Sequence, residues 1–186
     1  MTISNELFLA ILSMDAYNRG YLAAMGTKDS GIGGTSIGNA TIGNSSSVLG
    51  TEISQNASFF AQSYTLDGKT IISYRGTDNA RGDASSLFTN GDAWNGFPTG
   101  AGLQSNQAML AIDFYKSVLG SSDPQSANVV LTGHSLGGGL AGYVAALYGK
   151  TAIVFDQMPF TVAASNAYSK IWGQAPERRW TTALTY

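Results

Sequence analysis

The sequence predicts an α/β protein whose mostly parallel sheet carries helices on its faces. Two apolar stretches of strand length, 128–132 and 151–155, lie on either side of a Gly/Ala-rich stretch of helical character at 139–148. A second helical pattern covers 105–119, where apolar residues recur on one face. Strands that alternate with helices are typical of parallel sheets. The length of 186 residues suits one domain with a sizeable core, so we expect a single domain over 1–186.

The first half of the chain predicts a helix, a loop and a hairpin. Ser4 and Asn5 can cap a helix over 7–18, and the stripe expected to face the core comprises Leu7, Ala10, Ile11, Met14 and Tyr17–Asn18. Gly20–Ser54 is rich in Gly, Ser, Thr and Asn, which predicts a long surface loop with one strand at most. The runs 57–66 and 69–74 are joined by Asp67-Gly68 and predict a β-hairpin with a tight primed turn.

Composition excludes several classes of protein. Only 12% of the residues are charged and the formal net charge is −2, so nothing favours binding to nucleic acid or to an anionic membrane surface. The chain has no cysteine, so disulfides have no part in it. The N-terminus lacks the basic region of a Sec-type signal peptide, and its apolar run is too short to span a bilayer. Cytoplasmic residence and leaderless secretion both fit.

The most informative segment is Gly133-His134-Ser135-Leu136-Gly137-Gly138. A strand before it, a helix after it and the G-x-S-x-G spacing predict a nucleophile elbow, in which Ser135 occupies a strained turn at the edge of the sheet. Side chains at the flanking glycines would collide with the neighbouring strand and helix. The backbone N–H of Leu136, at the start of the helix, would be one donor of an oxyanion hole.

The hairpin and the elbow together resemble the class 3 (fungal-type) lipases and related bacterial α/β-hydrolases. The second hairpin arm runs into Arg75-Gly76-Thr77, and Gly96-Phe97 precedes the helix that leads to the elbow. The resemblance covers about 57–160. It implies an α/β-hydrolase-type sheet, with Thr77 supplying the second oxyanion donor through its backbone N–H. It also implies that the chain is incomplete at its C-terminus, being the N-terminal portion of a longer enzyme.

The serine has no evident base. A serine hydroxyl needs an adjacent base, usually histidine, and the only histidine of the chain is His134. Adjacent side chains of a strand point to opposite faces, so His134 is expected to lie away from the Ser135 hydroxyl and to be structural, like Gly133, Gly137 and Gly138. Asp156 follows the strand at 151–155 and is the candidate triad acid, although an Asp that caps the next helix or turn is an equal interpretation.

The segment 78–102 follows the proposed oxyanion turn. Its apolar side chains, such as Leu87, Phe88 and Trp94, fit a lid or acyl groove as well as a loop anchored to the core. The acidic residues Asp78, Asp83 and Asp92 match no calcium-binding spacing. No metal and no cofactor are expected.

Three functions stay open at this point. The first is a serine hydrolase of lipase or esterase type, cleaving carboxylic esters of acyl lipids, with its base outside this chain. The second is a catalytically inactive module of the same fold that binds acyl ligands. The third is an acyl hydrolase with a Ser135–Asp156 dyad, although Asp156-Gln157 does not match the Asp-Gly-Gly/Ala motif of patatin-like enzymes.

Overall fold

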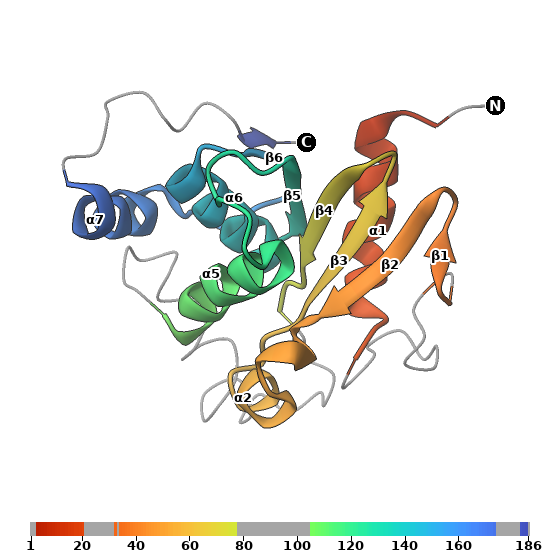
Figure 1. The fold of residues 1–186 in the computed structure, drawn as a ribbon, viewed down its shortest axis with the longest axis horizontal. Coiled ribbons are helices and arrows are strands. Elements are labelled where there is room, and N and C mark those ends of the chain that lie inside the picture. The colour runs from red at the N-terminus through yellow and green to blue at the C-terminus, as the bar shows by residue number, and fades with distance from the viewer. Residues whose placement is uncertain (1–2, 21–31, 33, 78–104, 174–182, 186) are drawn as a thin grey trace.

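A computed structural model describes residues 3–20, 32, 34–77, 105–173 and 183–185 (Figure 1). The expectations for Gly96-Phe97, for a lid at 78–102 and for Asp78, Asp83 and Asp92 all concern residues outside these ranges. The proposed oxyanion turn, Arg75 to Thr77, lies within the described ranges.

The described strands form one mixed sheet, and each strand pairs only with its neighbours along the chain. The pairs from β1 to β4 are antiparallel, whereas those from β4 to β7 are parallel. Five of the strands (β2, β4, β5, β6 and β7) therefore point the same way, which confirms the expected mostly parallel α/β class. The strands are β1 (Ser36–Ile37), β2 (Ala40–Ser45), β3 (Ala61–Leu66), β4 (Lys69–Tyr74), β5 (Val129–His134), β6 (Thr151–Phe155) and β7 (Ala183–Thr185).

Helices cover both faces of the sheet, as Figure 1 shows. Helix α1 packs against β4, β5 and β6 on one face, and α5, α6 and α7 share the larger core on the other. The remaining helical turns, η1 and α2, connect β2 to β3. The helices are α1 (Asn5–Tyr17), η1 (Ser46–Leu49), α2 (Thr51–Asn56), α5 (Asn106–Leu119), α6 (Leu136–Tyr148) and α7 (Thr161–Trp172).

Local chemistry explains where the predicted elements begin and turn. The Ser4 hydroxyl accepts a hydrogen bond from the Leu7 N–H at 3.2 Å and caps α1. Ser105 caps α5 in the same way through the Ala108 N–H. In the hairpin, Asp67 and Gly68 both have positive φ, of 49° and 73°, as a primed turn requires. The helix expected at 139–148 begins three residues earlier, at Leu136.

The apolar stripe predicted for α1 is only partly correct, because Asn18 is buried and Ile11 packs against the core but two other members are exposed. Leu7 and Met14 are 52% and 41% exposed, while Leu9, Leu12 and Ala16 are buried. The buried face also holds polar residues that find partners on the sheet, among them Ser13, whose hydroxyl lies 2.9 Å from the hydroxyl of Thr132. Periodicity counts such polar residues as exposed, so it placed Leu7 and Met14 in the stripe and left the buried Ser13 and Asp15 out of it.

The prediction of a surface loop over Gly20–Ser54 was also wrong for its second half. The chain there forms β1, β2, η1 and most of α2, and β2 extends the sheet beside β3. Its apolar residues are isolated among small and polar ones, so no regular hydrophobic alternation marks the strands, although Ile37, Ala40 and Ile42 belong to or pack against the core beneath α1. Main-chain pairing adds to this, aided by Gln62, whose amide donates to the carbonyls of Gly43 and Asn44.

Candidate functional site

Ser135 lies between the end of β5 and the first residue of α6 and is half-buried. Its backbone has φ 55° and ψ −124°, a combination that residues other than glycine rarely adopt. Three hydrogen bonds maintain this conformation. The Ser135 N–H donates to the Phe155 carbonyl at 3.0 Å, and the Ser135 carbonyl accepts from the N–H groups of Gly139 and Met158 at 3.1 and 3.0 Å. The strain is thus offset by main-chain contacts with α6 and the end of β6.

The glycines around Ser135 lie where main chains meet. A Cβ atom on Gly137 would overlap the Tyr74 carbonyl oxygen at the end of β4. A Cβ atom on Gly133 would overlap the main chain of Gly137 itself. Gly138 has slightly more room, with the Gln157 Cβ 3.0 Å from the position of an added methyl group. The first turn of α6 therefore packs directly on the main chains of two strands. This close packing places the N-terminus of α6 at the carboxyl ends of those strands.

Helix α6 presents its N-terminus at this edge. The N–H groups of the first helical residues, beginning with Leu136, have no carbonyl acceptor within the helix, and the helix dipole places partial positive charge there. The helix carries no charged side chain in its first or last turn. An oxygen that gains negative charge beside Ser135 would meet these donors.

The turn after β4 reaches the same edge. Tyr74 is in register with Gly133 of β5, so Arg75, Gly76 and Thr77 follow β4 beside the elbow. A Cβ atom on Gly76 would lie 2.6 Å from the His134 carbonyl oxygen, so these two main chains are in contact. Thr77 is half-buried. Ser135, Leu136 and Thr77 are thereby brought to one edge of the sheet, although each role in chemistry remains a prediction.

His134 lies on the α1 side of the sheet. Its Nδ1 atom is 3.1 Å from the hydroxyl of Tyr17, the last residue of α1, and the two rings are tilted at 60° with centroids 6.0 Å apart. Thr132, two residues earlier on β5, likewise bonds with Ser13 of α1. Position 134 shares the strand face of position 132 because side chains alternate along a strand.

Asp156 directly follows β6, is exposed and has a positive φ of 44°. It lies between two residues, Phe155 and Met158, whose main chains bond to Ser135. Among the described residues, its carboxylate has no hydrogen-bond or ion-pair partner. The main chain on either side of Asp156 thus contacts Ser135. A triad acid orients a histidine, but no imidazole lies next to the Asp156 carboxylate among the described residues.

The sequence did not reveal the network at the end of α1. Asp15 is fully buried and accepts hydrogen bonds from the Tyr64 hydroxyl at 2.8 Å and from the Ile32 N–H at 2.6 Å. It also pairs with Arg19, whose carbonyl accepts from Arg75 Nη1 at 3.3 Å. The partners are up to 56 positions apart, so no local pattern could have indicated them. The one signal was an acidic residue one helical turn before an arginine.

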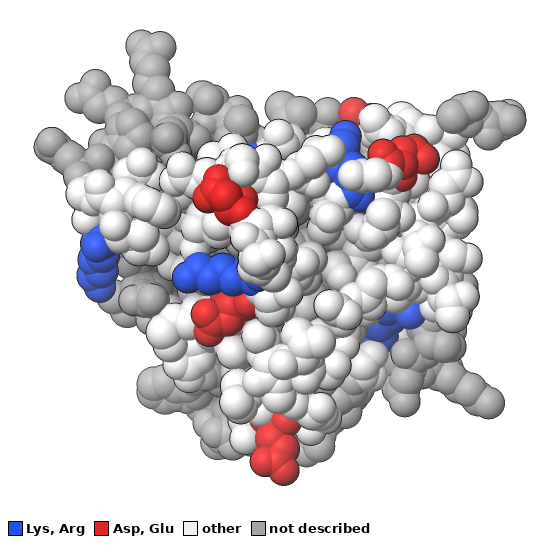
Figure 2. All heavy atoms as spheres, viewed as in Figure 1, with Lys and Arg blue, Asp and Glu red and all other residues white. Residues whose placement is uncertain are grey.

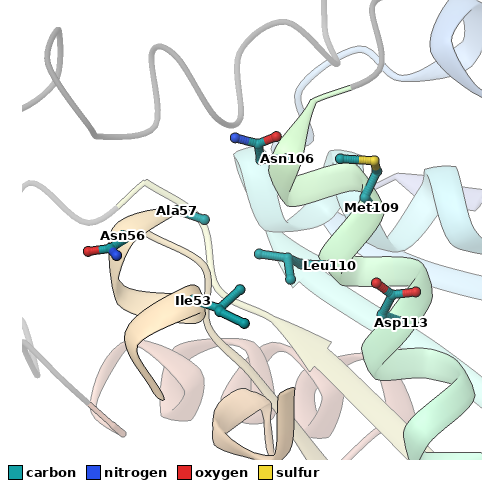
Figure 3. Close-up of a pocket in the computed structure, with 7 residues that line it drawn as sticks. All are labelled: Ile53, Asn56, Ala57, Asn106, Met109, Leu110 and Asp113. Atoms are coloured by element: carbon teal, nitrogen blue, oxygen red, sulfur yellow. The ribbon is translucent and has the colours of Figure 1, made fainter. Parts of the chain in front are cut away.

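Two cavities lie in the described part of the chain away from the elbow. The larger, about 370 Å³, lies between α2 and α5, where Ile53 and Leu110 face each other (Figure 3). The smaller, about 190 Å³, is lined by Gly20, Ser45, Ser46, Ser47, Thr51, Ser54, Gln55 and Phe60. Ser135 lines neither of these two cavities.

Charged side chains are few and scattered on the face shown in Figure 2. Within the described ranges, no three His, Asp or Glu residues converge as metal ligands would. Every helix in those ranges is too short or too polar to span a bilayer.

Comparisons with known proteins point to lipases. The "Putative lipase ATG15" of Debaryomyces hansenii is 40% identical over 53 residues, which span 28% of this chain but only 9% of that protein's length. The sequence pattern of the phospholipase-like family described as the Tle-like phospholipase domain matches residues 9–167. The expected likeness to lipases is confirmed at this level, while the class 3 (fungal-type) assignment stays a prediction. Since the match extends over most of the chain, the protein belongs to this phospholipase-like family.

Proposed function

We propose that this chain is a serine hydrolase of lipase or esterase type that cleaves carboxylic esters of acyl lipids. The observation that carries the proposal is the backbone of Ser135, strained at φ 55° between β5 and the N-terminus of α6. A serine in this position exposes its hydroxyl beside unsatisfied N–H donors, which is what acyl transfer to a hydroxyl requires. Membership of a phospholipase-like family supports a lipid hydrolase.

In the proposed reaction, Ser135 Oγ attacks the ester carbonyl carbon and its proton passes to a base. The carbonyl oxygen gains the negative charge and accepts hydrogen bonds from the N–H groups of Leu136 and Thr77. The tetrahedral species expels the alcohol, which takes up the proton, and leaves an acyl-Ser135 ester. Water then attacks this ester with the same base, releasing the carboxylic acid and restoring the serine.

We assign the base to a group outside these 186 residues. The one histidine is bonded to Tyr17 on the α1 side of the sheet, where its Nδ1 atom is engaged. Asp156 stays the candidate acid, because its exposed carboxylate follows the strand next to the elbow. The same engagement of His134 favours one alternative, a module that binds acyl ligands without turning them over.

A fluorophosphonate probe tests the nucleophile. The probe phosphonylates an activated serine with loss of fluoride. In the full-length enzyme, which supplies the base, we expect mass spectrometry to find the adduct on the peptide that contains Ser135. Ser135→Ala should abolish this adduct, whereas Ser169→Ala, which changes an exposed serine of α7, should leave it unchanged. Equal labelling of Ser135→Ala and wild type would contradict the proposal. Ligand binding without any serine adduct would favour the binding module.

A second experiment, also in the full-length enzyme, tests the donor at Thr77. Thr77→Pro removes the proposed N–H, and we expect the rate of Ser135 labelling to fall about a hundredfold, as loss of one oxyanion donor does in serine hydrolases. Thr77→Ala is the matched control, because it retains the N–H and removes only the side chain beyond Cβ. A folded Thr77→Pro variant with the wild-type rate would exclude this donor.

A further inference from the structure

Tyr17 connects α1 to the residue before the proposed nucleophile. Its hydroxyl lies 3.1 Å from Nδ1 of His134 and 3.5 Å from the His134 carbonyl oxygen, so one group contacts both the side chain and the main chain of that residue. Tyr17 is half-buried at the last position of α1. A hydrogen bond to one ring nitrogen of histidine fixes the orientation of the ring.

The same hydroxyl also lies against the residue before Thr77. A Cβ atom on Gly76 would overlap the Tyr17 hydroxyl, and it would also lie 2.6 Å from the His134 carbonyl oxygen. Gly76 thus leaves the space that the hydroxyl occupies. A single oxygen atom therefore sits where the turn after β4 meets the end of β5.

The end of α1 is itself firmly attached. Asp15, two residues before Tyr17, bonds to the Tyr64 hydroxyl of β3 and pairs with Arg19. The Arg19 carbonyl in turn accepts a hydrogen bond from Arg75, which lies next to Gly76. The helix end that carries the Tyr17 hydroxyl is therefore bonded to β3 before Tyr17 and to Arg75, just after β4, beyond it.

We infer that Tyr17 is a positioning residue, whose hydroxyl sets the separation between Ser135 and the oxyanion turn by contacting the residue before each of them. The inference rests on the proposed function, since it concerns the alignment of the attacking oxygen with the N–H donors. Tyr17 itself does not touch the reacting atoms. Displacement of a reacting group by about 1 Å can lower a rate about a hundredfold, so a small loosening here has a measurable effect.

The test compares the kinetics of fluorophosphonate labelling in variants of the full-length enzyme, which supplies the base, that each lose one tyrosine hydroxyl. Tyr17→Phe should lower the maximal labelling rate at saturating probe by about tenfold or more, and should leave the probe concentration for half-maximal rate unchanged. Tyr115→Phe is the matched control. It removes the 2.6 Å hydrogen bond from the Tyr115 hydroxyl to the Pro124 carbonyl, away from the elbow, and should leave the maximal rate unchanged.

Variants of His134 keep the inference testable if Tyr17→Phe folds poorly. His134→Asn retains a polar atom near the Nδ1 position and should label at close to the wild-type rate. His134→Leu removes that atom and should lower the maximal rate as Tyr17→Phe does. Since both changes break the same contact, the Tyr17→Phe/His134→Leu double variant should lose no more than either single variant.

The outcomes separate the inference from the proposed function. Wild-type protein that forms no adduct at Ser135 would overturn both. An adduct at Ser135 with equal maximal rates for wild type and Tyr17→Phe would overturn only the role of Tyr17. Loss of labelling in His134→Asn as complete as in Ser135→Ala would overturn it too, because His134 would then act on the hydroxyl instead of tying the elbow to α1.

Discussion

Replacing Gly137 with alanine tests the close approach on which the elbow depends. The added methyl group would overlap the Tyr74 carbonyl oxygen and lie 2.7 and 2.8 Å from the carbonyl carbons of Arg75 and Tyr74. Carbon atoms in contact are normally about 3.5–4.0 Å apart, so α6 must move away from β4 by about 1 Å. Both sides of this contact are main chain, so no side-chain rotation can relieve it.

The size of the effect follows from two opposing contributions. Overpacking of this kind costs about 1–3 kcal/mol, and a contact between two main chains belongs at the upper end of that range. Alanine within a helix is favoured over glycine by about 1 kcal/mol. We therefore expect Gly137→Ala to lower the free energy of unfolding by about 2 kcal/mol, or about 4–8 °C in Tm for a domain of this size.

Gly138→Ala is the matched control for Gly137→Ala, because it changes the next residue of the same helical turn. Its methyl group would meet the Gln157 Cβ at 3.0 Å and the Gly133 carbonyl oxygen at 3.1 Å, so a shift of a few tenths of an ångström suffices. We expect a loss of about 1 kcal/mol or less. Guanidinium chloride unfolding measures both variants. A Gly137→Ala midpoint at or above wild type, or a larger loss for Gly138→Ala, would refute the reasoning.

Three further predictions concern a buried ion pair, a buried tyrosine and the missing base. Asp15→Ala should lower the free energy of unfolding by about 3–5 kcal/mol, because it leaves Arg19 buried without its carboxylate, and a loss below 1 kcal/mol by denaturant unfolding would contradict this. Burial raises the pKa of Tyr143 to about 12, and stability that is present below the unfolded pKa of about 10 should be lost above it, by about 1 kcal/mol at pH 11 for this residue. Tyr143→Phe should reduce the loss between pH 8 and pH 11 by about that amount, while burial of Tyr64, Tyr74 and Tyr115 maintains the rest; an equal loss in wild type and Tyr143→Phe would speak against it. The purified 186-residue chain should hydrolyse a medium-chain p-nitrophenyl ester about as slowly as its Ser135→Ala variant, since loss of the base costs on the order of a millionfold in a serine protease, and efficient Ser135-dependent turnover would place a base within the chain.

The parts of the fold that obey local rules were predictable. Asp67-Gly68 predicts a primed turn because both positions need positive φ, and both have it. The glycines of the G-x-S-x-G segment predict a crowded strand-to-helix turn, and both are crowded by main chain. In each case the residues that determine the geometry lie within a few positions of one another, so a local sequence pattern is enough to predict it.

The parts that depend on distant partners were not predictable. Ser13 and Asp15 are polar, so the pattern of α1 placed them outside, but Thr132 and Tyr64 satisfy them within the protein. Tyr17 was expected to belong to an apolar stripe, whereas its hydroxyl meets a residue 117 positions away. For the candidate site, the sequence indicated Ser135 and the residues that the structure brings to the same edge of the sheet, and their roles stay predictions. The contacts between α1 and the candidate site could be identified only from the structure.

The sequential order of the sheet bears on how the chain would assemble during synthesis. Every described strand pairs with the strand made just before it, so β1 to β4 can pair as soon as they leave the ribosome. Helix α1 is the exception. It is made first, yet Thr132 and His134, which bond to Ser13 and Tyr17, are made more than a hundred residues later. Until β5 arrives, the buried face of α1 lacks much of its contact surface, and at 5–20 residues per second that interval is on the order of ten seconds. The nascent chain is therefore expected to be most open to aggregation, and most in need of a chaperone, during that interval.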